Sequence, residues 1–190
     1  SILSWLRRLI EEKSLSVVEK MQPSSGGFLE AVPLTAFVTM SLCSIGLPEH
    51  PIVQKAIRFL TALQRDDGSW PVDVDLATWV TTLATNALAI SESPDWQNTI
   101  SLDWILNCQH LDVHPFTGAP PGGWGWTDHS GSVPDADDTS GALLALGHFW
   151  KFADGPTQLK ILPAALLGIE WLVNLQNRDG GWPTFCRGWG

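Results

Sequence analysis

The chain has 190 residues, which is long enough for one domain with its own hydrophobic core. Charged residues make up 16% and hydrophobic residues 44%, a balance that argues against intrinsic disorder. The formal net charge of −9 argues against a nucleic-acid partner, because phosphate binding needs a basic face. We identify no signal peptide and no apolar run that approaches the length of a membrane-spanning helix.

The cysteines and the aromatic residues restrict the class of protein further. Cys43, Cys108 and Cys186 lie far apart, without the paired spacing of a zinc site or a disulfide framework. We expect buried, reduced thiols, as in a cytoplasmic protein. The chain holds 11 Trp, 7 Phe and no Tyr, a usage that favours a structural repeat.

A repeat is present. A seven-residue segment begins with Gln, contains Gly in its turn and ends in an aromatic residue, at 22–28, 64–70 and 176–182. A fourth copy begins at Gln109 and is stretched by an insertion before Gly123 and Trp124.

Each repeat turn lies between two segments with helical periodicity. Apolar helical segments precede the turns at 57–63, 102–108 and 169–175, and further helices are predicted over 34–45, 76–90 and 139–152. No strand pattern competes, so the predicted fold class is all-α, built from αα-hairpins that stack into a solenoid or close into a ring. We expect each Gln to satisfy backbone groups at a helix end while the aromatic ring packs over it, joining neighbouring hairpins.

An acidic stretch, Asp135, Asp137 and Asp138, stands where a loop becomes a helix. One such residue is an ordinary N-cap, and the helix dipole favours ionised carboxylates there. Three adjacent acids repel one another, and burial in a dry cavity would hold one of them in its protonated form. On this stretch alone, a solvated helix cap is the simpler interpretation. Asp73 and Asp75, in the equivalent loop one repeat earlier, are interpreted as helix caps.

Together, the Gln-x5-aromatic turns and the stretch from Asp135 to Thr139 resemble the squalene–hopene cyclases, oxidosqualene cyclases and related class II terpene cyclases. The resemblance covers essentially the whole chain, including the tail 180–190, although Ser140 stands where Ala is usual. It implies an αα-toroid in which residues 1–190 form a single partial (α/α)6 barrel domain of about four repeats.

The resemblance also implies a chemistry. Asp137 matches the acid that protonates a terminal alkene or epoxide, and Asp135 and Asp138 match the carboxylates that orient and tune it. A solvated Asp, with a pKa of about 4, would be ionised at neutral pH and could not do this. Aromatic faces stabilise the migrating carbocation in an apolar cavity. Trp79, Trp124 and Trp126 are the candidates for substrate contact, with core packing as the alternative for each; no metal or cofactor is implied.

The family pattern further implies that the chain is a fragment that is inactive alone, because the cavity needs more repeats. The expected partner is an apolar polyprene such as squalene, and the low Lys plus Arg count of 11 favours a hydrocarbon over a diphosphate. The expected location is the cytoplasm or the cytoplasmic face of a membrane, where the parent would be monotopic. Exposed ends of the repeat stack favour self-association.

Three alternatives stay open. A protein prenyltransferase β-subunit would need a zinc site, but the histidines are scattered on loops and helix ends, where solvated or capping roles are the default: His110, His114, His129 and His148. A non-catalytic toroid used for binding would treat the acids as caps. An inverting glycosidase would need two carboxylates about 6.5–9.5 Å apart, and the acids here are too clustered.

Overall fold

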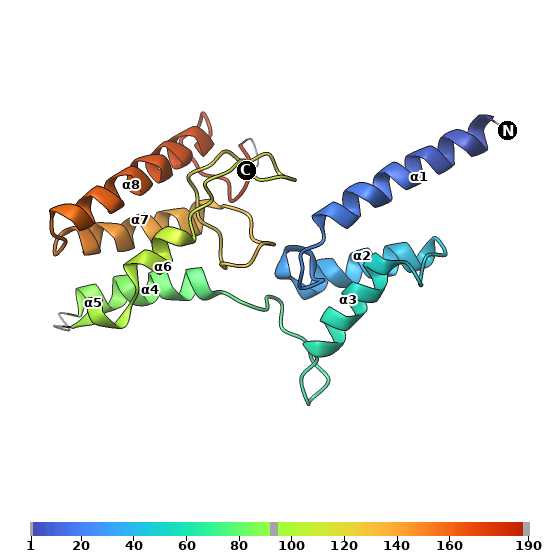
Figure 1. Ribbon diagram of the computed structural model, residues 1–190, viewed down its shortest axis with the longest axis horizontal. Coiled ribbons are helices and arrows are strands. Elements are labelled where there is room, and N and C mark those ends of the chain that lie inside the picture. The colour runs from blue at the N-terminus through green and yellow to red at the C-terminus, as the bar shows by residue number, and fades with distance from the viewer. Residues whose placement is uncertain (1, 92–94, 188–190) are drawn as a thin grey trace. The chain divides into compact units, whose positions relative to one another are not determined.

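A computed structural model describes residues 2–91 and 95–187 of the chain, and the last residues of the predicted tail, 188–190, lie outside that part. The described elements are α1 (Ile2–Met21), a 3-10 turn η1 (Phe28–Glu30), α2 (Val32–Ser44), α3 (Pro51–Ala62), α4 (Ala77–Ile90), α5 (Trp96–Thr99), α6 (Leu102–Asn107), α7 (Ala136–Trp150) and α8 (Gly155–Leu175). Within the described residues, β structure is limited to two isolated bridges. The all-α prediction is confirmed (Figure 1).

The predicted helices are present, but α3 and α8 begin well before the predicted segments 57–63 and 169–175, and the boundary also differs at the acidic stretch. The helix predicted over 139–152 is α7 and begins at Ala136, because the Asp135 side chain caps it. Asp137 and Asp138 therefore lie in the first turn of the helix and not in the loop before it. One repeat earlier, the N-cap position of α4 is Leu76, and the preceding Asp75 binds the first helical N–H, that of Ala77, through its Oδ1 at 2.7 Å. Asp73 forms a bridge with Ala31 and caps no described helix.

The chain divides into two compact units. The N-terminal unit comprises residues 1–74 and 129–131, and the C-terminal unit comprises 75–128 and 132–190. Each unit has its own buried cluster of hydrophobic side chains. That all 190 residues belong to one partial barrel domain stays a prediction.

In the N-terminal unit, α2 packs on α3 (Figure 1). The core of this unit consists of Phe28, Leu42, Ile52 and Val53. Phe28 comes from the first repeat turn, so the turn contributes directly to the core. Its backbone N–H donates to Thr35 Oγ1 of α2 at 2.9 Å.

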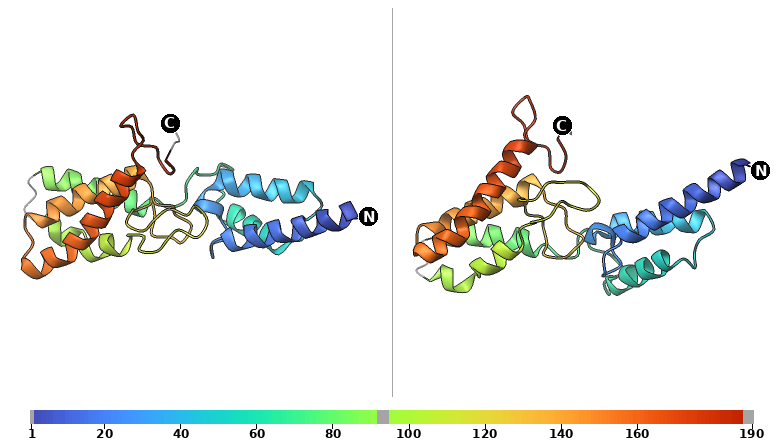
Figure 2. Two further views of the ribbon diagram at one scale, coloured as in Figure 1. Left: turned by 90° about the horizontal axis from the view of Figure 1, so that it is seen from above. Right: turned by 45° about the horizontal axis from the view of Figure 1, so that its top comes forward.

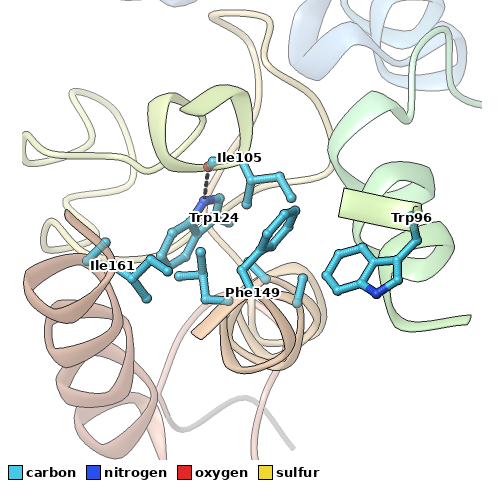
Figure 3. Close-up of a cluster of buried hydrophobic side chains, with 9 residues drawn as sticks. Trp96, Ile105, Trp124, Phe149 and Ile161 are labelled. Atoms are coloured by element: carbon cyan, nitrogen blue, oxygen red, sulfur yellow. Dashed lines mark hydrogen bonds between the residues drawn. The ribbon is translucent and has the colours of Figure 1, made fainter. Parts of the chain in front are cut away.

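In the C-terminal unit, α7 lies between α4 and α8 and packs against both (Figures 1 and 2). Trp124 fills the centre of the core between α6, α7 and α8, and Trp96 stacks at a tilt on Phe149 with ring centroids 4.7 Å apart (Figure 3). These two Trp side chains are 0% and 3% exposed. Trp171 is buried as well, whereas five Trp side chains are exposed: Trp5, Trp70, Trp79, Trp150 and Trp182.

Two sequence expectations need correction. By length and composition, α8 does meet the criteria for a membrane span. Length and composition alone do not assign a helix to a membrane, because core helices meet the same criteria; 28% of the apolar window of α8 is buried, and Ile161, Gly168 and Trp171 are among the buried residues of this helix. The three cysteines are free thiols, as expected, but they are half-buried. Burial of Cys108 nevertheless raises the pKa of its thiol to about 11.

The repeat turns share one hydrogen-bond pattern. In each, the Gln Nε2 donates to the carbonyl of the Gly two residues before the aromatic: to Gly26 (3.0 Å), Gly68 (3.4 Å), Gly122 (2.7 Å) and Gly180 (2.8 Å). All four glycines have positive φ, a conformation that side chains with a Cβ rarely adopt. The Trp indoles donate to helix carbonyls at Leu60, Ile105 and Leu172. The Gln thus closes the turn, and the indole, where present, binds the end of the helix.

Candidate active site

The start of α7 is anchored on Trp124. The backbone N–H of Asp135 donates to the Trp124 carbonyl at 3.0 Å. Thr139 Oγ1 accepts the Trp124 N–H at 2.9 Å and donates to its carbonyl at 3.3 Å. The Trp124 indole in turn donates to the Ile105 carbonyl at 2.8 Å (Figure 3). Hydrogen bonds to the buried Trp124 therefore fix the position of the acidic stretch.

The three acids divide into a buried pair and an exposed member. Asp135 and Asp138 are 3% and 2% exposed. Asp137 lies between them in sequence and is exposed in the described part of the chain. The three side chains therefore share one helix start but face different surroundings.

Burial raises the pKa of Asp135 to about 9, and the neighbouring Asp138 adds to the rise by hydrogen bonding and repulsion. Burial likewise raises the pKa of Asp138, and the charge of Asp137 contributes. Asp135 Oδ1 accepts the Asp138 N–H at 2.8 Å. The carboxyl oxygens of Asp138 are buried, and no N–H of the described residues binds them. With a pKa of about 9, Asp135 keeps its proton at neutral pH, and burial favours the neutral form of Asp138 as well.

Aromatic side chains lie beside this helix start. The Trp126 carbonyl accepts the N–H groups of Thr78 and Trp79 at 3.1 and 3.2 Å, which ties it to α4. The Trp126 ring meets Phe185 edge to face, with centroids 6.2 Å apart. The segment with Phe185 reaches the acids, because the Ala136 N–H donates to the Thr184 carbonyl at 2.9 Å.

Sequence reasoning missed Phe185. The sequence feature that could have identified it is its position three residues after Trp182, in the tail that contributes to the family resemblance. Trp126 is half-buried, and Trp79 is 39% exposed on α4, so both can contact a ligand. Trp124 is fully buried in the core, the alternative that the sequence left open, and it drops out of the substrate-contacting set.

Two histidines, His110 and His114, lie in the loop before Trp124. The His110 and His114 rings are 6.0 Å apart. His114 Nδ1 accepts the Thr117 N–H at 3.2 Å, and His110 Nε2 lies 3.2 Å from Ser132 Oγ. Burial lowers the pKa of both rings. His114 is 7% exposed and accepts a backbone N–H of its own loop, so of the two expected roles the capping one applies.

The C-terminal unit matches a known protein family. The family profile described as the squalene–hopene cyclase C-terminal domain matches residues 76–188. The chain belongs to the squalene–hopene cyclase family. The match begins at the boundary of the C-terminal unit, which carries the acids, Trp126 and Phe185. The αα-toroid assignment is thereby supported by both the fold and the family.

The chain is also similar in sequence to several named cyclases. Sporulenol synthase of Bacillus subtilis is 29% identical over 162 residues, which are 80% of this chain and 24% of that protein. A probable squalene–hopene cyclase of Sinorhizobium fredii is 26% identical over 95% of this chain and 29% of its own length. The squalene–hopene cyclase of Alicyclobacillus acidocaldarius is 24% identical over 94% and 29%. The chain thus spans about a quarter of the length of these relatives.

Proposed function

We propose that this chain carries the proton-donating site of a class II cyclase, which converts an apolar polyprene such as squalene into a ring system. The family and the names of the relatives support the class of reaction. The observation that carries the site is the buried Asp135–Asp138 pair with its raised pKa, next to the outward-facing Asp137 at the start of α7.

Asp137 is the proton donor in this proposal, because it is the member of the three whose carboxyl a substrate can reach. Its O–H bond breaks as a C–H bond forms at the terminal alkene carbon. The alkene electron pair makes the new bond, and a carbocation remains on the adjacent carbon. Internal alkenes then attack that cation in turn, and no electrons are exchanged with a cofactor.

The buried pair stands on either side of Asp137 in the sequence, and burial raises the pKa of both of its members. An apolar substrate that covers the helix start removes water from it, and the loss of water favours the neutral form of a carboxyl group. The helix dipole favours the ionised form. Proton transfer in this proposal therefore depends on the exclusion of water by the substrate.

The reaction also requires stabilisation of the carbocation, which the aromatic rings provide. A carbocation near Trp126 and Phe185 is attracted to their faces, worth about 0.5–2 kcal/mol each. Trp79 is a further candidate on the neighbouring helix. We place the working enzyme in the cytoplasm or on the cytoplasmic face of a membrane, where such a substrate dissolves.

Replacement of Asp137 tests the proposal. In the full-length protein that contains this chain, Asp137→Asn should lower the rate of cyclised product formation from squalene by about 10²–10⁴-fold or more. Gas chromatography with mass spectrometry measures the product. The control is Asp112→Asn, an exposed acid of the preceding loop, which should leave the rate unchanged. Full activity of Asp137→Asn would instead support a non-catalytic toroid.

The 190-residue chain alone should form no cyclised product from squalene, because protonation needs a closed apolar cavity. The same assay, run on the isolated chain at high concentration, checks this. Cyclised product there would show that these residues are sufficient.

A further inference from the structure

The insertion at 110–122 lies in the C-terminal unit and folds back on itself. The N–H of His110 donates to the Gly123 carbonyl at 2.9 Å, which closes the base of the loop. Nearer the tip, the N–H of His114 donates to the Ala119 carbonyl, also at 2.9 Å. The two imidazole rings lie 6.0 Å apart. The loop therefore holds its two histidines close together by backbone hydrogen bonds.

Both rings contact one residue outside the insertion, Ser132. His110 Nε2 lies 3.2 Å from Ser132 Oγ. The ring of His114 hydrogen-bonds to the Ser132 backbone. Ser132 is 2% exposed and His114 is 7% exposed, so these contacts are shielded from water. The side chain of Ser132 and its backbone are thus bound by different histidines.

Only two residues separate Ser132 from Asp135, the N-cap of α7. A Cβ on Gly125 would lie 2.7 Å from the Val133 carbonyl oxygen and 3.1 Å from the Ser132 Cβ, so this segment packs closely against the backbone beside it. Pro134 follows, and its ring restricts φ. The connection has little freedom to adjust, and a shift of Ser132 is therefore transmitted to Asp135.

The contacts of His114 require a neutral imidazole. His114 Nδ1 accepts the Thr117 N–H at 3.2 Å, so this nitrogen carries no proton. The other ring nitrogen carries the proton and donates it to the Ser132 backbone carbonyl. Burial lowers the pKa of both rings, which favours this neutral form. Position 114 thus uses both ring nitrogens, whereas at His110 one nitrogen makes the contact with Ser132.

We propose that His110 and His114 are positioning residues of the acid site. By binding Ser132 they fix the backbone that leads to Asp135, and with it the direction of the Asp137 carboxyl in the first turn of α7. They act through Ser132 and not on the substrate. The consequence for the reaction rests on the proposed function, whereas the consequence for the position of the helix start does not.

Hydrogen–deuterium exchange of the full-length protein that contains this chain tests the structural part. His110→Leu leaves the buried Ser132 hydroxyl without its partner, and amides of the peptide that spans 135–139 should exchange about 3–30-fold faster. Ser132→Ala removes the same contact from the other side and should also raise the exchange, which keeps the test valid where His110→Leu does not fold. The matched control is His148→Leu, at a half-buried His in the last turn of α7, which should leave the exchange at 135–139 unchanged.

A conservative variant separates the hydrogen bond from packing. His110→Gln places an amide nitrogen near the position of Nε2, so its exchange should stay close to that of the wild type. His114→Gln cannot both accept from Thr117 and donate to Ser132 with the geometry of the ring, so its exchange should be faster. Equal exchange in His110→Gln and His110→Leu would overturn the proposal, because packing alone would then explain the effect.

The same variants, assayed with squalene, test the consequence for the reaction. In His110→Leu, kcat for cyclised product should fall about 10–100-fold, because the acid is misplaced, with KM within about twofold. His110→Gln should restore kcat. Unchanged exchange in both His110→Leu and Ser132→Ala, faster exchange with unchanged kcat, or a change confined to KM would each overturn the proposal. Full activity of Asp137→Asn would reject the proposed function alone, and the exchange results would still decide whether the histidines hold the helix start.

Discussion

At the residue scale, the start of α7 combines an ordinary N-cap with an unusual acid. Asp135 makes the capping bond that any Asp or Asn could make, yet it is buried against Asp138 and its pKa is raised. A solvated cap would have the opposite shift. Asp154, the N-cap of α8, accepts the Thr157 N–H at 2.9 Å, and its hydrogen bonds with the side chain and then the backbone of Thr157 lower its pKa. The chain thus contains both kinds of cap.

The raised pKa predicts a pH dependence of stability. The unfolded chain releases the Asp135 proton near pH 3.8, while the folded chain holds it to about 9. The folded state binds more protons in that window, so the contribution of this group to the free energy of unfolding falls as pH rises through it. Asp135→Asn keeps the cap and cannot ionise. We expect it to be more stable than the wild type at pH 8, by about 1–3 kcal/mol, with the difference vanishing near pH 4.

Urea unfolding at several pH values measures this difference. The control is Asp154→Asn, which replaces an exposed cap with a lowered pKa and should be slightly less stable than the wild type at pH 8. Equal destabilisation by the two substitutions would show that Asp135 is only a cap.

The sequence showed the acids but could not assign their surroundings. Their types and spacing predicted a tuned group, and the resemblance named Asp137 as the donor. Which members are buried depends on the pairing of Asp135 with Trp124 across the intervening loop, a contact that periodicity does not encode. Phe185 was missed for the same reason, because its neighbour Thr184 meets α7 only in the folded chain.

At the element scale, the repeat turns were predicted to join neighbouring hairpins. The structure shows that the number of contacts made by each Gln depends on whether a second helix lies against its turn. Gln109 is 7% exposed and bonds both its own turn and α8. Gln176 bonds only its own turn among the described residues. The sequence pattern is the same in both, so the difference comes from the helix that each turn meets.

This difference predicts unequal effects of the same substitution. Gln109→Ala leaves two buried carbonyls without their donor and opens a cavity, at a cost of about 2–4 kcal/mol in the free energy of unfolding. Gln176→Ala, in the same unit, should cost less than about 1 kcal/mol. Urea unfolding of both variants compares them. Equal losses of free energy of unfolding in the two variants would contradict the interpretation that Gln109 joins its turn to α8.

At the scale of the whole molecule, helical periodicity and the repeat predicted an all-α fold and its hairpins. They did not predict the division into two units, because both carry the same turn signature. The family profile begins at residue 76, almost at that division. Only the C-terminal unit contains the features on which the proposed chemistry depends.

The central claim is that the reaction starts with a proton delivered from an exchangeable carboxyl. Incubation of the full-length protein with squalene in D₂O tests it most directly, with the product analysed by mass spectrometry. The account predicts cyclised product with one deuterium bound to carbon at the initiation site, and loss of that product in Asp137→Asn. Cyclised product without deuterium on carbon would contradict it.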